Sequence, residues 1–258
     1  MPAKIICIAN QKGGVGKTTT AVNLSASLAA AEKPTLVIDI DPQANAGSGL
    51  GVDKNSIKQS IYQVLIDQIP LSKILVKPQK QLPFLTLAPS NTDLIGAEVE
   101  LIGVLAREMK LKKAVEEVMD QFSYILIDCP PSLGMLTVNS LTCAHSIIIP
   151  LQCEYFAMEG LGQLLSTISI IKKNLNKDLA IEGILLTMFD MRNNLSHQVQ
   201  EEVTKHFKNQ VFSAVIPRNV RLSECSSFGL PIILYDIDSK GAKSYLDLAH
   251  EIIDREVT

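Results

Sequence analysis

The stretch that most constrains the fold lies near the N-terminus, where a short apolar run, KIICIA (4–9), meets a glycine-rich loop, NQKGGVGKTTT (10–20). The continuously apolar run is typical of a strand that is covered on both faces. The residues that follow, TTAVNLSASLAAA (19–31), have a helical pattern. A strand that enters a helix through a tight glycine loop is typical of a parallel α/β sheet.

The glycine loop has the composition of a phosphate-binding site. Glycines allow successive backbone N–H groups to turn inward and form a concave anion site, and the helix N-terminus adds partial positive charge. We expect Lys17 to reach the β- and γ-phosphates of a nucleotide and the Thr18 hydroxyl to bind Mg²⁺. The predicted nucleotide contacts in the loop are Gly13, Gly14, Val15, Gly16, Lys17, Thr18 and Thr19.

The loop departs from the usual template, G-x-x-x-x-G-K-[ST]. Gln11 takes the place of the first glycine, and a second lysine, Lys12, stands directly after it. An ordinary nucleotide-binding loop needs only one lysine, so Lys12 requires a separate explanation.

The rest of the chain alternates between short apolar runs and longer helical patterns. This alternation predicts a doubly wound α/β fold, with a mostly parallel sheet and helices on both faces. We expect residues 1–258 to form a single domain, in which the irregular stretch 42–83 is a long functional crossover. The predicted strands are 4–9, 34–41, 82–89, 124–130, 145–151, 181–189 and 212–217, and the predicted helical segments are 19–31, 93–121, 161–175, 196–207 and 242–257.

Acidic residues end two of the predicted strands. Asp39 and Asp41 close LVIDID, and Asp128 closes YILID. Ligands of open α/β sheets bind at the carboxyl ends of the strands, so we expect these carboxylates beside the phosphate site. A carboxylate there can bind Mg²⁺, directly or through water, or orient a water molecule for attack on a phosphate.

Composition limits the other possibilities. The net charge of −3 and the sequence pI near 5.8 give no overall basic field, so any contact with nucleic acid must come from a local patch. The five cysteines form no C-x-x-C pair, which favours buried, reduced thiols over metal ligands. No run approaches the length of a membrane-spanning helix, and the first apolar run is too short for a signal peptide, so we expect a cytoplasmic protein.

Several segments together resemble one family. KGGVGKTTT, which begins with Lys12, resembles the deviant Walker A loop of the ParA/MinD class of P-loop ATPases. DIDPQANAGSGLG and DCPPSLGMLTVNSL look like the two switch regions of that class, and IPRNVRLSECSSFGLPI is similar to the C-terminal block of its chromosomal ParA (Soj) branch. The resemblance extends from about residue 4 to residue 250 and implies ATP and Mg²⁺ as cofactors.

The resemblance implies roles for individual residues. In this class two ATP-bound subunits face each other, and a lysine at the position of Lys12 contacts the partner's nucleotide, so dimerisation depends on ATP. Lys12, Lys17 and Asp41 would be the catalytic residues, with Asp41 positioning the attacking water. Asp128 would support Mg²⁺ together with Thr18. Pro217 and Asn219 would contact the adenine.

The resemblance also implies binding partners. A weak ATPase would be stimulated by a centromere-binding protein of the ParB (Spo0J) type, and the ATP-bound homodimer would bind double-stranded DNA without sequence preference. Arg192 and at least one of Arg218 and Arg221 would form the DNA patch, in a nucleoid-associated protein that serves a chromosome or a plasmid. Contacts of this kind go to phosphates, so binding should depend strongly on salt.

Two alternatives remain at this stage. A MinD-like positioning ATPase would bind membrane through a basic amphipathic C-terminal helix, but this chain ends in the acidic sequence AHEIIDREVT. A metabolic P-loop kinase or ligase would need a second substrate pocket, which neither 42–83 nor the C-terminal block suggests.

Overall fold

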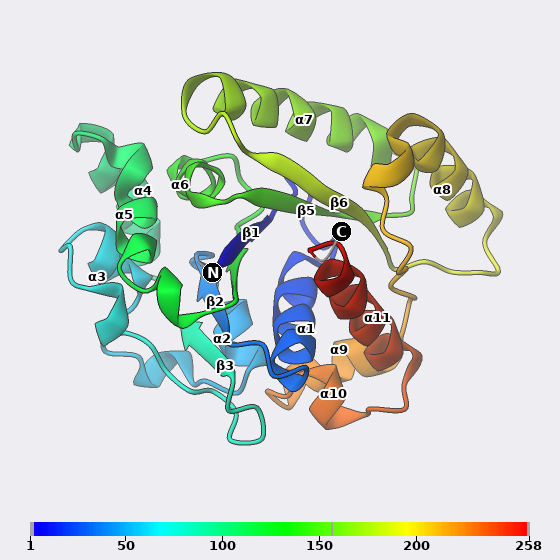
Figure 1. The fold of residues 1–258 in the computed structure, drawn as a ribbon, viewed down its shortest axis with the longest axis horizontal. Helices are drawn as coiled ribbons and strands as arrows, with labels where there is room; N and C mark the ends of the chain where they lie inside the picture. Colours follow the sequence, from blue (N-terminus) through cyan, green and yellow to red (C-terminus); the bar gives the residue numbers. More distant parts are fainter. Residues whose placement is uncertain (1–2, 156, 257–258) are drawn as a thin grey trace.

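The computed structural model describes residues 3–155 and 157–256, which contain one sheet of six parallel strands in the order β3-β2-β4-β1-β5-β6 (Figure 1). This confirms the doubly wound α/β prediction. The strands β4, β2 and β3 lie on one side of β1, β5 and β6 lie on the other, and all strand pairs are parallel. The strands are β1 (Lys4–Ile8), β2 (Thr35–Asp39), β3 (Leu85–Ala88), β4 (Tyr124–Asp128), β5 (Ser146–Gln152) and β6 (Ala180–Thr187).

Helices cover both faces of the sheet, as predicted (Figure 1). Alternate residues of β1 point to opposite faces, so Ile5 and Cys7 enter one buried cluster while Ile6 and Ile8 enter another. The first cluster includes residues of α3–α8, and the second includes residues of α1, α2 and α9–α11. The helices are α1 (Lys17–Ala30), α2 (Asn45–Gly49), α3 (Ile61–Leu65), α4 (Leu94–Glu100), α5 (Lys110–Glu116), α6 (Met135–Cys143), α7 (Ala157–Asn174), α8 (Asn194–Phe207), α9 (Val220–Ser227), α10 (Ile232–Tyr235) and α11 (Lys240–Asp254).

The prediction of a strand at 212–217 is wrong. This segment runs beside β6, where the Phe212 N–H donates to the Ile184 carbonyl (3.0 Å) and the Ile216 N–H to the Leu186 carbonyl (2.9 Å). Between these two bonds the N–H groups of Ser213 and Ala214 donate to the Glu251 carboxylate of α11 instead. A continuous ladder of backbone hydrogen bonds to β6 cannot form here, because the Glu251 side chain accepts these N–H groups.

The long helical region predicted at 93–121 is divided. After α4 the chain forms two 3₁₀ turns, η3 (Leu101–Gly103) and η4 (Arg107–Met109), before α5 begins. Ala106 has a left-handed backbone (φ +53°), which interrupts a right-handed helix. The short helices α6 and α9 were not predicted, because eight or nine residues are too few to show a clear helical period.

Candidate nucleotide-binding site

The glycine loop connects β1 to α1 at the carboxyl edge of the sheet. Gly14 and Gly16 have left-handed backbones (φ +76° and +88°), and Gly16 is the N-cap of α1. Glycine is the residue that adopts this conformation without steric cost, so the sequence permits the turn that directs N–H groups toward a ligand. The loop and the start of α1 therefore have the backbone conformation that the predicted anion site requires.

The two lysines of the loop have different surroundings. Lys17 is 7% exposed, and its Nζ donates a hydrogen bond to the Lys12 carbonyl oxygen (3.0 Å). Burial lowers the pKa of Lys17, and the negative charges of Asp128 and Asp41 oppose this change. The Lys12 side chain is 42% exposed and forms an ion pair with Glu154, which follows β5. Lys17 thus points into its own site, whereas Lys12 lies at the surface.

Asp39 and Asp128 end neighbouring strands and are paired in register across β2 and β4. Asp128 is fully buried, and within the described residues neither of its carboxylate oxygens has a hydrogen-bond partner of regular geometry. Burial raises the pKa of Asp128 well above its usual range, the charge of Asp39 adds to this, and the nearby Thr18 hydroxyl opposes it. A buried carboxylate in this state fits a cation that would satisfy it.

Asp39 differs from Asp128 because backbone N–H groups donate hydrogen bonds to its carboxylate. Its two oxygens accept hydrogen bonds from the N–H groups of Asp41 (3.2 Å) and Gly47 (3.0 Å). Burial raises the pKa of Asp39 to about 7 despite these bonds. Asp39 therefore fixes the turn after β2 and the start of α2, while Asp41, at 7% exposure, accepts the Gln43 N–H through Oδ1 (2.9 Å).

Oxygen ligands are those that Mg²⁺ prefers, and it is usually bound through one or two carboxylates together with substrate phosphates. The Thr18 hydroxyl and the unsatisfied Asp128 carboxylate supply such a set beside the phosphate loop. The residues present therefore fit Mg²⁺ bound together with a nucleotide.

A cavity of about 320 Å³ lies beside the loop. Asn219 is the N-cap of α9 and its side-chain oxygen accepts the Arg221 N–H (2.8 Å), so its amide N–H₂ is the group that can meet a base. Pro217 supplies an apolar wall. The structure thus brings both predicted adenine residues to the loop, and the cavity is lined by Gly16, Thr19, Thr187, Met188, Ile216, Pro217, Arg218, Asn219, Leu222, Ser223, Ser226 and Tyr245.

Three further residues, which the sequence analysis did not indicate, hold the loop in its conformation. Asn10 donates to the Pro150 carbonyl (2.7 Å) and accepts the Lys12 N–H (3.0 Å). The Thr187 hydroxyl, at the end of β6, donates to the Val15 carbonyl (2.9 Å). Glu154 pairs with Lys12. Asn10 could have been noticed as a polar residue that ends a strand, but the other two are distant in sequence and gave no signal.

The three predicted DNA-binding arginines lie in two settings. Arg192 is almost fully exposed and pairs with Asp190 (3.2 Å), whose pKa it lowers with a smaller contribution from Arg218. Arg218 is exposed and adjoins this pair, because its N–H donates to the Phe189 carbonyl (3.0 Å). Arg221 instead pairs with Glu224 (3.0 Å) and Asp236 (3.4 Å). Arg192 and Arg218 therefore form a local cluster, and Arg221 is neutralised by two carboxylates.

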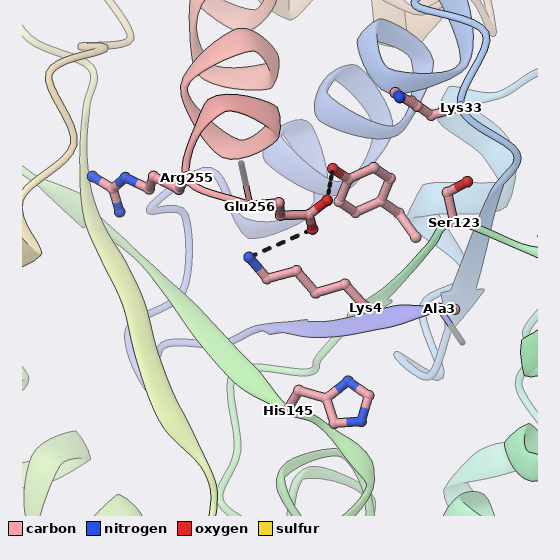
Figure 2. Close-up of a pocket in the computed structure, with 8 residues that line it drawn as sticks. Ala3, Lys4, Lys33, Ser123, His145, Arg255 and Glu256 are labelled. Atoms are coloured by element: carbon pink, nitrogen blue, oxygen red, sulfur yellow. Dashed lines mark hydrogen bonds and ion pairs between the residues drawn. The ribbon is translucent and has the colours of Figure 1, made fainter. Parts of the chain in front are cut away.

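A larger cavity, of about 630 Å³, lies at the opposite edge of the sheet (Figure 2). There Lys4 contacts Glu256 and Glu182, and the Tyr124 hydroxyl donates to Glu256 (2.8 Å). Arg255 donates to Glu251 (2.7 Å). Two of the basic groups at this edge, Lys4 and Arg255, already have acidic partners, so the cavity offers an anion less positive charge than its lining residues suggest.

The C-terminal helix packs into the fold. The apolar face of α11, including Tyr245, Leu248 and Ile252, is buried, and α11 lies against α1 (Figure 1). Among the helices of the described residues, none combines the length and the apolar character that crossing a bilayer requires. The five cysteines are buried and free, as expected.

The fold and the glycine loop define a P-loop nucleotide-binding ATPase domain, and residues 3–181 match the family model described as an AAA domain. The cobyrinic acid a,c-diamide synthase of Mycobacterium smegmatis, solved with bound ADP and magnesium, has a TM-score of 0.87 at 36% identity, covering 99% of this chain and 96% of that one. The MinD protein of Pyrococcus horikoshii, complexed with Mg-ADP, has a TM-score of 0.78 at 25% identity, covering 99% and 97%.

Relatives that match nearly the whole chain identify its family within this class of ATPases. The chain is 57% identical to the chromosome partitioning protein ParA of Myxococcus xanthus, over 98% of this chain and 89% of that protein. It is 55% identical to the sporulation initiation inhibitor protein Soj of Bacillus subtilis, over 96% of this chain and 98% of that protein. The chain belongs to the ParA/Soj family of chromosome-partitioning ATPases.

Proposed function

We propose that the chain is a weak ATPase that forms a dimer when it binds ATP, and that the dimer binds DNA without sequence preference during chromosome or plasmid segregation. The observation that carries this proposal is the contrast between the two loop lysines. Lys17 is buried in its own site, and Lys12 is exposed at the same edge. A surface cation next to a phosphate site can offset the charge of a second nucleotide brought by a partner subunit.

The residues around the loop support hydrolysis at this site. Lys17 and the backbone N–H groups of the loop would bind the phosphates, and Thr18 and Asp128 would bind Mg²⁺, which offsets phosphate charge when present. Asp41 would orient the attacking water, since it lies at the same strand edge with low exposure. Catalysis of this kind depends on positioning and electrostatics.

The exposed arginines support DNA binding. Arg192 and Arg218 would contact phosphates, and a dimer would join two such clusters into one patch. A single cluster on a chain of net charge −3 would attract DNA phosphates only weakly, so DNA binding would depend on dimerisation.

The partner, location and domain predictions are part of the same proposal. A ParB-type centromere-binding protein would stimulate hydrolysis, and the single-domain protein would be cytoplasmic and nucleoid-associated. The apolar face of α11 is buried, which argues against α11 itself serving as a MinD-like membrane helix.

One experiment tests the proposal directly. Binding of the chain to a random double-stranded DNA fragment is measured with ATP, ADP or no nucleotide, over a series of salt concentrations. We expect binding with ATP only, falling steeply as salt increases, and loss of binding in Lys12→Ala. DNA binding that is equal in the three nucleotide conditions, or absent with ATP at low salt, would contradict the proposal.

A further inference from the structure

The side chain of Asn10 extends the contact between β1 and β5 beyond the end of β1. The last backbone bond from this end of β1 runs from the Ala9 N–H to the Ile148 carbonyl of β5 (3.2 Å). Hydrogen bonds of a parallel strand pair are evenly spaced, so the next carbonyl of β5 that faces β1 is that of Pro150. This carbonyl accepts the side-chain amide of Asn10 (2.7 Å). The amide thus takes the place of a backbone donor where the loop turns away from the sheet.

The oxygen of the same amide holds the loop. It accepts the Lys12 N–H (3.0 Å), which is the two-residue turn that an asparagine side chain commonly forms. An asparagine amide carries both a donor and an acceptor, so one side chain, which is 3% exposed, joins β5 to Lys12. Asn10 therefore fixes where the Lys12 backbone lies relative to the sheet.

Both backbone polar groups of Lys12 are bound by buried side chains. Asn10 accepts its N–H, and the Lys17 ammonium donates to its carbonyl oxygen (3.0 Å). The glycines that follow are open, since a Cβ built on Gly13 or Gly14 would meet nothing within 4 Å in the described part of the chain apart from its chain neighbours. Lys12 is thus an exposed cation whose side chain starts from a fixed point.

A fixed starting point favours a contact between two subunits. The lysine ammonium lies on a flexible four-carbon stem, which loses rotamer freedom when it binds. Every further position that the backbone could sample before association would add to this entropic cost. Because Glu154 follows the strand to which Asn10 is bonded, the same contact also places the Lys12 backbone relative to its ion-pair partner.

We propose that Asn10 is a positioning residue for Lys12, whose backbone it holds in place for the contact with the nucleotide of a partner subunit. The inference rests on the proposed function, because it refines the role given there to Lys12. Asn10 should act mainly on dimerisation. Binding of nucleotide by its own subunit is the role proposed for Lys17 and the backbone N–H groups of the loop.

The test compares three variants of the full chain. Asn10→Ala removes both hydrogen bonds of Asn10. Asn10→Ser keeps an oxygen that can accept the Lys12 N–H but is too short to reach Pro150. Asn23→Ala is the matched control, because Asn23 is also a buried asparagine and forms two hydrogen bonds with backbone groups outside residues 10–16.

Two constants are measured for each variant. The affinity for ADP, from titration with a fluorescent derivative, reports binding by a single subunit. The dimer dissociation constant, from sedimentation velocity over a range of protein concentrations, is measured at saturating Mg²⁺ and non-hydrolysable ATP analogue. Urea unfolding gives the free energy of unfolding of each chain.

Asn10→Ala should weaken the dimer about 25-fold and change the affinity for ADP by less than about three-fold. A lost hydrogen bond costs about five-fold, and the factor applies twice because the dimer contains two Lys12 contacts. Asn10→Ser should weaken the dimer only about five-fold, since it keeps one of the two bonds. Asn23→Ala should lower the free energy of unfolding, as Asn10→Ala does, and leave the dimer constant unchanged.

A wild-type dimer in Asn10→Ala, or equal losses of ADP affinity and dimer stability, would overturn the inference. So would a dimer weakened equally by Asn23→Ala, because the effect would then follow stability, or an Asn10→Ser dimer as weak as that of Asn10→Ala. If Asn10→Ala does not fold, Asn10→Ser decides, and a wild-type dimer in that variant overturns the inference.

Lys12→Ala separates this inference from the proposed function. If Lys12→Ala dimerises as wild type does, the proposed function fails. If Lys12→Ala stays monomeric and Asn10→Ala dimerises as wild type does, only the role of Asn10 fails.

Discussion

Lys12 forms an ion pair with Glu154 of its own chain. This is the lysine that we propose contacts the nucleotide of a partner subunit. Its charge is therefore partly neutralised by a carboxylate that follows β5, and in the proposed dimer the partner's phosphates would have to replace this carboxylate.

Glu154→Gln should consequently promote dimerisation. A partly exposed ion pair contributes less than about 1 kcal/mol, so the ATP concentration for half-maximal dimerisation should fall by about two- to five-fold. Sedimentation velocity over an ATP series, in a variant that hydrolyses slowly, measures this value. Lys12→Ala is the matched comparison and should stay monomeric while still binding nucleotide. A higher ATP requirement in Glu154→Gln would show that Glu154 supports the dimer instead.

Asp128→Asn should separate stability from metal binding. The substitution removes a buried carboxylate without a regular hydrogen-bond partner, so the free energy of unfolding of the nucleotide-free chain should rise by about 1 kcal/mol. The dependence of nucleotide affinity on Mg²⁺ should disappear. Asp39→Asn is the control, and it should destabilise the chain because Asp39 accepts two backbone N–H groups. Urea unfolding and nucleotide titration check both, and equal destabilisation by the two variants would refute the distinction.

Asp41→Ala should slow hydrolysis while leaving ATP binding intact, because the proposed role of Asp41 is to orient the attacking water. The variant should therefore accumulate as the ATP dimer on DNA. Phosphate release and DNA retention after dilution are the measurements. Wild-type turnover in this variant would reject the assignment.

The arginines should differ in their effect on DNA binding. Arg192→Ala and Arg218→Ala should each weaken ATP-dependent binding and reduce the salt slope by about one per lost phosphate contact. Arg221→Ala should have a smaller effect, because Glu224 and Asp236 already neutralise Arg221. Titrations at several salt concentrations distinguish the three. A dominant loss in Arg221→Ala would mean that these ion pairs open on DNA.

His145 should make stability depend on pH. Its Nδ1 accepts the Ile5 N–H (3.0 Å), and burial together with Lys112 and Lys4 lowers its pKa below the usual value. The unfolded chain therefore binds a proton at higher pH than the folded chain, so the contribution of His145 is present above about pH 6.5 and is lost as pH falls. Unfolding of wild type and His145→Gln between about pH 5.5 and 7.5 should show a difference that narrows at low pH. A constant difference would contradict this.

The parts that follow from local sequence were predictable. Gly14 and Gly16 specify the turn of the loop, and the apolar runs around Asp39 and Asp128 specify buried parallel strands whose ends meet at one edge. These features depend on backbone conformation and on the pattern of neighbouring residues. They place the phosphate loop and its carboxylates without knowledge of the rest of the fold.

Other features depend on which distant groups compete for the same donor or charge. Residues 212–217 read as a strand, but Glu251 of α11 takes two of their N–H groups. Asp39 and Asp128 look alike in sequence, yet only one is satisfied by the backbone. Sequence alone thus determined the family, the sheet and the loop. The tertiary structure decided the partner of Lys12 and the carboxylate that has no hydrogen-bond partner of regular geometry, because both are settled by contacts between residues far apart in the chain.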